Sequence, residues 1–436
     1  MNRSVINEHR RLLIKGSVGT LMIKSTSMGL SFLVSLLLAR LLGAEEYGSY
    51  VYLLAVVGLL GIFGLMGFDK LLVRNISAYA AYFEWGRIRG LLRRSYQVVS
   101  VFSLTLMVCA GVIGWLIADN SSGLLPTFWI ALLILPLITL TRARQSVMQG
   151  FQRIVLGQLP EMVISPLLFL VLILSVFVIG NARATSKIAI ELNILALTAG
   201  LIAATYLSRK VMPHEVRDSA PVFETRLWLK SIAPLILISG MILVNSHIDI
   251  IMLKVIAGSS EAGIYAVANR GAELITYVLL SVNTAFAPII SRLHVSKEIS
   301  RLQREVTYSA RIVLVFSFMG TLILILFGHW FLLLFGEAFI SGRTALTILS
   351  IGQLINAAAG SVGLLLIMSG NENVVAIGIG IGVVTNVILN SLLIPVYKME
   401  GSAIATVASI IIWNIILAVL VWRKLGLNPT AFRLKK

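Results

Sequence analysis

The chain has 436 residues, of which 58% are hydrophobic and 13% are charged, and its formal net charge is +17. Soluble globular proteins are about half apolar and a quarter charged, so this composition excludes an ordinary soluble domain. Lysines and arginines gathered on the inner side of a membrane explain the positive charge, and no nucleic-acid partner is expected.

Long apolar runs predict transmembrane helices along the whole chain. A helix of about 20 apolar residues crosses the ~30 Å hydrocarbon layer and satisfies its own backbone hydrogen bonds. We therefore predict an all-α integral membrane protein with about twelve transmembrane helices. The expected spans are 18–42, 47–69, 95–118, 124–147, 160–180, 186–208, 232–256, 262–287, 310–333, 343–368, 374–395 and 401–422.

The distribution of basic residues predicts the orientation. If both termini are cytoplasmic, 28 lysines and arginines lie in inward segments, six in outward segments and two inside spans, which accounts for all 36. This bias follows the positive-inside rule and indicates a multi-pass protein of the cytoplasmic (inner) membrane. The inward loop 70–94 mixes aromatic and basic residues, as an interfacial amphipathic helix or a solvated connector would.

A short pattern occurs twice. Residues 43–50 contain G-x-x-E-x-G-x-Y, and residues 258–265 contain it again 215 positions later. Adding 215 to the first six spans gives positions close to the last six, so we predict two six-helix bundles, 1–208 and 232–436, joined by a cytoplasmic linker at 209–231. Bundles of six helices share one orientation, which is the parallel repeat of carriers whose substrate sites lie between the halves.

Short segments along the chain carry a resemblance to a known family. They are ARLLGAEEYG at 39–48, GFDK at 67–70, QGF at 149–151, HID at 247–249, GIY at 263–265, Asn386 with Asn390, and EGSAIAT at 400–406. In order and spacing they resemble the polysaccharide-transport (Wzx-type O-antigen/oligosaccharide) flippases of the multidrug/oligosaccharidyl-lipid/polysaccharide exporter superfamily.

The resemblance implies a function and its partners. Such proteins move undecaprenyl-diphosphate-linked oligosaccharide units from the inner to the outer leaflet for O-antigen, capsule or exopolysaccharide assembly. The resemblance also implies a proton or sodium ion as the coupling ion, and a polysaccharide polymerase and assembly machinery as further partners.

Four basic residues are candidates for binding such an anionic cargo: Lys24, Arg270, Arg142 and Arg144. Charges inside a membrane are costly and usually face the interior of a bundle. Each has a structural alternative. Lys24 could snorkel to the inner interface, Arg270 could pair with Glu273 at i, i+3, and the other two could be inner-side anchors.

Four titratable residues are candidates for ion coupling: Asp249, His247, Glu161 and Glu273. Asp249 falls in the outer half of the span 232–256, beside His247 and Asn245, so the three could also form a polar cluster that fixes helix packing. Glu161 follows Pro160 and could be a helix-start carboxylate stabilised by the helix dipole.

Other functions remain as alternatives. A multidrug exporter of the same superfamily would share the fold, but a carrier of cations favours acidic rather than basic residues within its spans. The peptidoglycan-precursor flippase is similar but usually has fourteen spans. A membrane polysaccharide polymerase or ligase usually carries a large outward loop, which this sequence lacks. No Ser-His-Asp order, metal cluster or phosphate-binding loop occurs, so we expect no enzyme, cofactor or metal.

Overall fold

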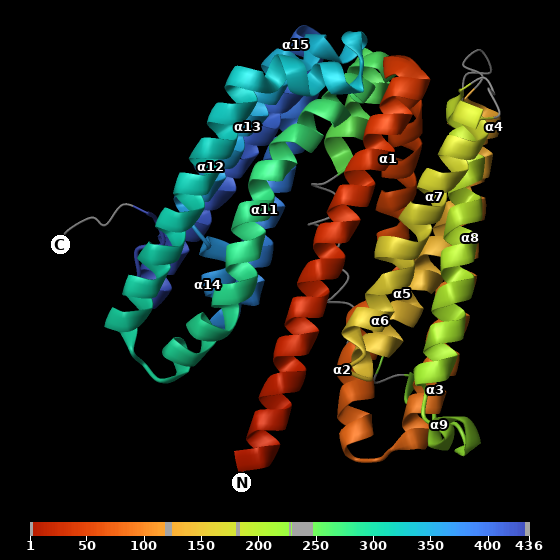
Figure 1. Ribbon diagram of the computed structural model, residues 1–436, viewed down its shortest axis with the longest axis vertical. Helices are drawn as coiled ribbons and strands as arrows, with labels where there is room; N and C mark the ends of the chain where they lie inside the picture. Colours follow the sequence, from red (N-terminus) through yellow and green to blue (C-terminus); the bar gives the residue numbers. More distant parts are fainter. Residues whose placement is uncertain (1–2, 118–123, 180–183, 226–227, 229–246, 432–436) are drawn as a thin grey trace. The chain divides into compact units, whose positions relative to one another are not determined.

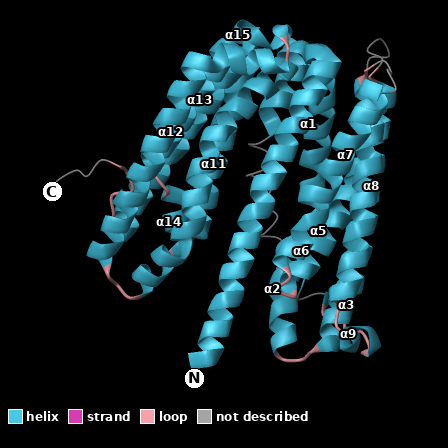
Figure 2. Ribbon diagram, viewed as in Figure 1, coloured by secondary structure: helices cyan, strands magenta, loops and turns pink. Residues whose placement is uncertain are grey.

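A computed structural model describes residues 3–117, 124–179, 184–225, 228 and 247–431. Within these residues every regular element is helical (Figures 1 and 2). The predicted all-α membrane fold is thereby confirmed. The predicted span 232–256 falls largely outside the described residues, which include only its last part from residue 247 onward.

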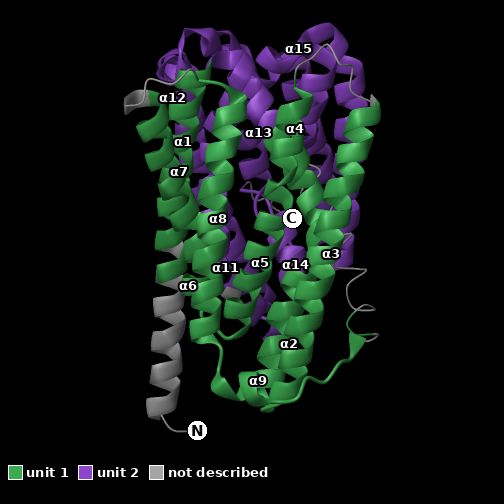
Figure 3. Cartoon of the chain, turned by 90° about the vertical axis from the view of Figure 1, so that its right-hand side faces the viewer, with its two compact units in different colours: residues 1–42, 53–243 green, residues 43–52, 244–436 purple. Residues whose placement is uncertain are grey.

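The chain divides into two compact units, shown in different colours in Figure 3. Unit 1 comprises Met1–Leu42 and Leu53–Leu243, and unit 2 comprises Gly43–Tyr52 and Val244–Lys436. The assignment of Gly43–Tyr52 to unit 2 was not predicted, because these residues lie within the first long helix. That helix therefore contributes to both units.

Most helices belong to a single unit. Unit 1 contains most of α1 (Arg3–Leu65), and α2 (Phe68–Ala81), α3 (Trp85–Ile117), α4 (Leu125–Leu132), α5 (Ile134–Gly150), α6 (Ile154–Leu159), the π-helix η2 (Pro160–Ile164), α7 (Ser165–Ile173), the π-helix η3 (Leu174–Ile179), α8 (Ser186–Val211) and α9 (His214–Asp218). Unit 2 contains residues 43–52 of α1, a helical segment 247–257, α11 (Ser259–Val295), α12 (Ile299–Phe335), the 3₁₀-helix η4 (Glu337–Gly342), α13 (Arg343–Ala359), α14 (Val362–Met368) and α15 (Glu372–Leu425).

Eight helices of the described chain are long and apolar enough to cross a membrane, and a pair bent by 43° within α11 makes nine. Two of the eight are more than twice as long as the ~20 residues that one crossing needs. The span Met22–Leu65 has 44 residues and α15 has 54. Each has a backbone break, at Gly43 (φ 72°, ψ 177°) and at Lys398 (φ 46°, ψ −126°). The predicted pairs 18–42 with 47–69, and 374–395 with 401–422, lie on either side of these breaks.

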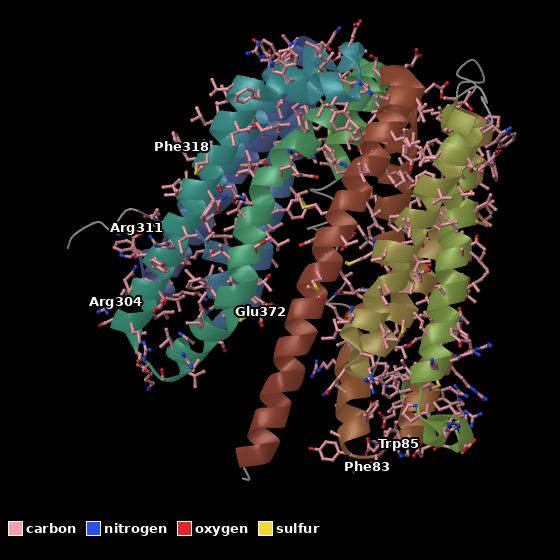
Figure 4. All side chains as sticks on the ribbon, in the orientation of Figure 1. Phe83, Trp85, Arg304, Arg311, Phe318 and Glu372 are labelled. Carbon is pink, nitrogen blue, oxygen red and sulfur yellow. The ribbon has the colours of Figure 1, made fainter. Side chains whose placement is uncertain are left out.

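One end of unit 1 has an apolar core that fixes α2 against its neighbours. Phe68, Leu71, Leu72 and Ile76 recur at helical spacing on one face of α2 and are buried against residues of α3 and α5. The same spacing leaves the polar residues of α2 on its opposite face. Figure 4 shows the turn between α2 and α3, where Phe83 and Trp85 are labelled.

The linker after α8 is docked onto this end of unit 1. The backbone N–H of Val222 donates to Gly86 O (2.9 Å), and Gly90 lies so close to Val222 that a Cβ there would collide with the Val222 carbonyl. The Arg87 guanidinium forms an ion pair with Glu224 (3.1 Å), and the Tyr79 hydroxyl donates to the same carboxylate (3.0 Å). Burial raises the pKa of Tyr79, which keeps this donor protonated.

In unit 2 the two copies of the repeated pattern pack against each other. Gly43 and Gly258 both have positive φ (72° and 101°), so each copy begins at a break that favours glycine. Further along, a Cβ on Gly48 would collide with Ser259 O, and a Cβ on Gly263 would collide with Ala44 O. The two segments thus touch backbone to backbone, and glycine at these positions allows the approach.

We expect Gly48→Ala and Gly263→Ala to destabilise the protein, since each methyl group would push two helix backbones apart. Overpacking of this kind costs about 1–3 kcal/mol, or roughly 1–3 °C in a protein of this size. Thermal unfolding in detergent measures the change. Gly61→Ala is the matched control, because its Cβ would meet only Leu135 Cδ1 at 3.8 Å. An equal effect in all three variants would contradict the close contact.

Candidate functional site

A cavity of about 640 Å³ opens within unit 1, between the end of α1, the exposed face of α2, the second half of α5 and η2. Its volume falls within the ~300–1,000 Å³ typical of small-molecule sites. The lining combines charged and polar side chains with apolar ones. The residues are Gly61, Ile62, Leu65, Gly67, Asp69, Lys70, Val73, Arg74, Arg142, Gln145, Ser146, Gln149, Glu161 and Met162.

Helical spacing accounts for the charges that α2 contributes. Met66 (φ 50°) and Gly67 (φ 71°) end α1 and turn the chain into α2. Lys70 and Arg74 are then spaced i, i+4, so they share the face of α2 opposite its buried leucines. Both side chains are exposed and line the cavity.

Across the cavity, Arg142 of α5 forms an ion pair with Glu161 of η2. The Nε–Oε1 distance is 2.9 Å, and the two side chains retain 40% and 27% of their exposed surface. The π-turn begins at Pro160, which has no N–H to donate, and the Ser165 hydroxyl donates to the Pro160 carbonyl (3.0 Å). Single π-turns within helices often occur at functional sites.

The other predicted cations of unit 1 lie elsewhere. Arg144 stacks over the Tyr96 ring, 4.9 Å from its centroid, and its Nε is buried without a hydrogen-bond partner among the described residues. This contact packs α5 against α3. Lys24 is exposed on α1. Neither residue lines the cavity, whereas Lys70 and Arg74, which are not among the predicted site residues, both do.

A second polar site lies in unit 2 around Asp249, which is buried. Its Oδ2 accepts hydrogen bonds from the Tyr265 hydroxyl (3.0 Å) and the Thr406 hydroxyl (2.7 Å), and its Oδ1 accepts one from Asn390 Nδ2 (2.7 Å). Asn390 also donates to Asn386 Oδ1 (2.9 Å). Three donors from three separate segments therefore converge on one carboxylate.

Further oxygen atoms at this site have no donor of their own. Asn390 Oδ1 and the Ser402 hydroxyl are buried without a hydrogen-bond partner among the described residues, and so is one amide donor, Asn386 Nδ2. With the Asp249 carboxylate they form an oxygen-rich, singly acidic cluster. A cluster of this chemistry suits a proton or a hard monovalent cation better than an anion.

The predicted Asn-His-Asp cluster stays a prediction, because Asn245 lies outside the described residues. His247 lies two residues before Asp249 and is partly buried. The partners of Asp249 described above come from α11 and from both halves of α15, and they were not predicted. A sequence signal for two of the residues at this site was present in Asn386 and Asn390, which are polar residues spaced i, i+4 in an apolar run.

The predicted local ion pair between Arg270 and Glu273 is not formed among the described residues. Glu273 instead accepts a hydrogen bond from Asn269 Nδ2 (3.0 Å), its i, i+4 neighbour on α11. Arg270 is partly buried, and Tyr47 and Tyr50 are among its electrostatic neighbours, with Glu273. Arg270 therefore stays a candidate cation of unit 2 without a direct carboxylate contact.

Solved structures with the same fold define the class of protein. The chain is similar to an inward-facing multidrug resistance MATE family transporter of the MOP superfamily, with a TM-score of 0.77 and 14% identity over 94% of this chain and 98% of the other. It is also similar to lipid II flippase MurJ in an inward closed conformation (TM-score 0.71, 15% identity, 94% and 87% covered). A MOP superfamily transporter from Pyrococcus furiosus gives a TM-score of 0.66 at 13% identity, with 95% of each chain covered. The fold is therefore that of the MATE-like membrane transporters.

Sequence comparison gives the family. The profile described as "Polysaccharide biosynthesis protein" matches residues 13–294, which is more than half of the chain. The chain belongs to this family, and the predicted resemblance is confirmed. The MatE profile also matches residues 234–392.

A curated relative agrees with this assignment over part of its length. "Probable flippase AglR" from Haloferax volcanii is 29% identical over 175 residues, which cover 39% of this chain and 37% of the relative. The matched region of this chain thus spans only about a third of the length of that relative.

We expect Asn390→Leu to destabilise unit 2, because it leaves the buried Asp249 carboxylate without one of its three donors. An orphaned buried acceptor costs about 1–3 kcal/mol, or roughly 1–3 °C in thermal unfolding of a protein of this size. Asp249→Leu also removes the acceptor of the Tyr265 and Thr406 hydroxyls, so it should destabilise on its own, and the double variant should lose less than the sum of the two single losses. Ser391→Ala on the same helix is the control, because its hydroxyl is exposed and bonds only to Val387 O. Losses that simply add in the double variant would argue against the pairing.

Proposed function

We propose that the chain flips undecaprenyl-diphosphate-linked oligosaccharide units from the inner to the outer leaflet of the cytoplasmic membrane, for the assembly of O-antigen, capsule or exopolysaccharide. The observation that carries the proposal is a cavity lined by Lys70, Arg74 and Arg142 in a member of the polysaccharide biosynthesis family. A lipid diphosphate is strongly anionic, so its head group needs positive charge and water to leave the membrane surface.

The proposed mechanism is alternating access by the two helical bundles, 1–208 and 232–436, with both termini in the cytoplasm. The support for this mechanism is the parallel repeat in the sequence and the transporter fold. The lipid tail stays in the bilayer while the sugar and diphosphate cross between the bundles.

We further propose that a proton or sodium ion drives the cycle by binding at Asp249. This carboxylate is buried among hydroxyl and amide groups, and additional oxygen atoms beside it have no donor. Oxygen ligands are those that hard cations prefer. His247 neighbours this site along the helix, whereas Glu273 is bound to Asn269 and Glu161 to Arg142.

Reconstitution in liposomes tests the transport function. We expect the protein to move defined undecaprenyl-diphosphate glycans between leaflets, faster with an imposed sodium or proton gradient. Asp249→Asn keeps the size of the side chain but removes its charge, so the gradient should no longer accelerate transport. Asp218→Asn, at an exposed acid of α9, should behave like the wild type.

The alternative with specific support is ion-coupled multidrug export. The MatE profile matches residues 234–392, and the fold is similar to that of a multidrug resistance MATE family transporter. Transport of a cationic dye, with no movement of any glycan in the same liposomes, would select that function. The cations of the unit 1 cavity favour an anionic cargo.

A substitution at Arg270 tests whether unit 2 also contributes to cargo binding. A charge-assisted hydrogen bond contributes about 1.5–3 kcal/mol, so Arg270→Ala should slow glycan transport at least tenfold while leaving expression intact. Arg304→Ala is the control, because Arg304 is exposed near the start of α12 (Figure 4). Wild-type transport by Arg270→Ala would remove Arg270 from the site.

A further inference from the structure

The cavity of unit 1 has an excess of positive charge that the contacts among its lining residues do not neutralise. Three cations, Lys70, Arg74 and Arg142, line it together with two carboxylates, Asp69 and Glu161. Glu161 is committed to Arg142 through a 2.9 Å contact. Among the described residues, neither Lys70 nor Arg74 has an ion-pair partner. The cavity is therefore net positive, with two cations available to a ligand.

The arrangement of donors suits a diphosphate rather than a single carboxylate. An i, i+4 pair on α2 presents two cations from one wall, and Arg142 faces them from α5. Gln145 and Gln149, also spaced i, i+4, add amide donors on the same face of α5 as Arg142. Two phosphate groups can accept from several such donors at once, whereas one carboxylate cannot.

Glu161 already occupies the place of an anion in this cavity. Its carboxylate binds Arg142 at Nε, and no hydrogen bond from the other guanidinium nitrogens of Arg142 is recorded within the described residues. The pair remains partly exposed, at 40% and 27%. A phosphate entering the cavity can therefore compete with Glu161 for the guanidinium, which binds phosphate through paired N–H groups.

We propose that this cavity is the subsite for the diphosphate of the cargo and that Glu161 is an internal competitor, which holds Arg142 when the site is empty and releases it to the phosphate. This inference rests on the transport of lipid-linked diphosphates proposed above. It assigns Glu161 to cargo binding rather than to ion coupling, because a cavity with an excess of cations repels a coupling cation.

The competition predicts opposite effects from the two partners of one ion pair. The probe is farnesyl diphosphate, a short polyprenyl diphosphate without sugar, and its binding to the purified full-length protein in detergent is measured by calorimetry. Arg142→Gln and Lys70→Gln should each weaken binding about tenfold, since each removes a charge-assisted contact. Glu161→Gln should tighten binding about three- to tenfold, because the guanidinium no longer has a resident anion.

Two controls separate this effect from general electrostatics and from misfolding. Arg153→Gln removes an exposed cation on the turn after α5 that does not line the cavity, and it should leave binding unchanged. The unfolding temperature of every variant reports whether the fold persists, and Arg142→Lys should retain part of the affinity. Farnesol in place of the diphosphate should not bind measurably at the same concentrations.

The outcomes distinguish this inference from the proposed function. A folded Glu161→Gln variant that binds the probe with unchanged or lower affinity would overturn the competition. Equal losses in Arg153→Gln and Lys70→Gln would overturn the subsite. If the probe binds as expected but liposomes show no glycan movement, the transport function fails and the diphosphate subsite stands.

Discussion

A charge placed within a hydrocarbon layer has to be neutralised by a partner, by hydrogen bonds or by water, and this constraint sorts the polar residues of the molecule. Asp249 meets it with three donors from distant segments. Arg144 meets it by stacking on Tyr96. Lys70 and Arg74 have no ion-pair partner among the described residues; their side chains are exposed and line a cavity. Cations of this kind, which no neighbouring carboxylate holds, identify a space that an anionic ligand can enter.

The duplicated pattern shows how a sequence repeat is converted into a contact. Glycine at Gly43 and Gly258 gives each copy a left-handed break, and glycine at Gly48 and Gly263 removes the side chains that would separate two helix backbones. Gly43 and Gly258 thus serve the backbone conformation, and Gly48 and Gly263 serve the packing. At Gly48 and Gly263 a larger residue would be compatible with helix formation but not with the close approach of the two backbones.

Apolar length and charge bias were sufficient to predict the helices, because both follow from the bilayer itself. They could not predict that the pair 18–42 and 47–69 would form one element broken at Gly43, since the break interrupts the axis but barely interrupts the hydrophobic run. The contacts of the residues at the Asp249 site were harder to predict from the sequence. Asn390 and Thr406 lie 141 and 157 residues after Asp249, so their contacts depend on tertiary packing.

The spacing of residues along a single helix, in contrast, does indicate part of the cavity lining. The i, i+4 separation of Lys70 and Arg74, opposite the buried Phe68, Leu71 and Leu72, indicates a cationic face on α2. The i, i+3 pairing of Arg270 with Glu273 failed because a competing neighbour, Asn269, is better placed for the carboxylate at i, i+4.

The two sites have opposite chemistry and lie in different units, which sets a requirement on any coupling between them. A cation gradient drives an anionic cargo only if both ligands bias the same conformational equilibrium. Helix α1 has residues in both units: Gly61 and Leu65 line the cationic cavity, and Gly48 touches α11 two residues before Tyr265, which binds Asp249. The stretch of α1 from Gly48 to Gly61 is therefore a covalent link between the segment packed beside Tyr265 and the wall of the cationic cavity.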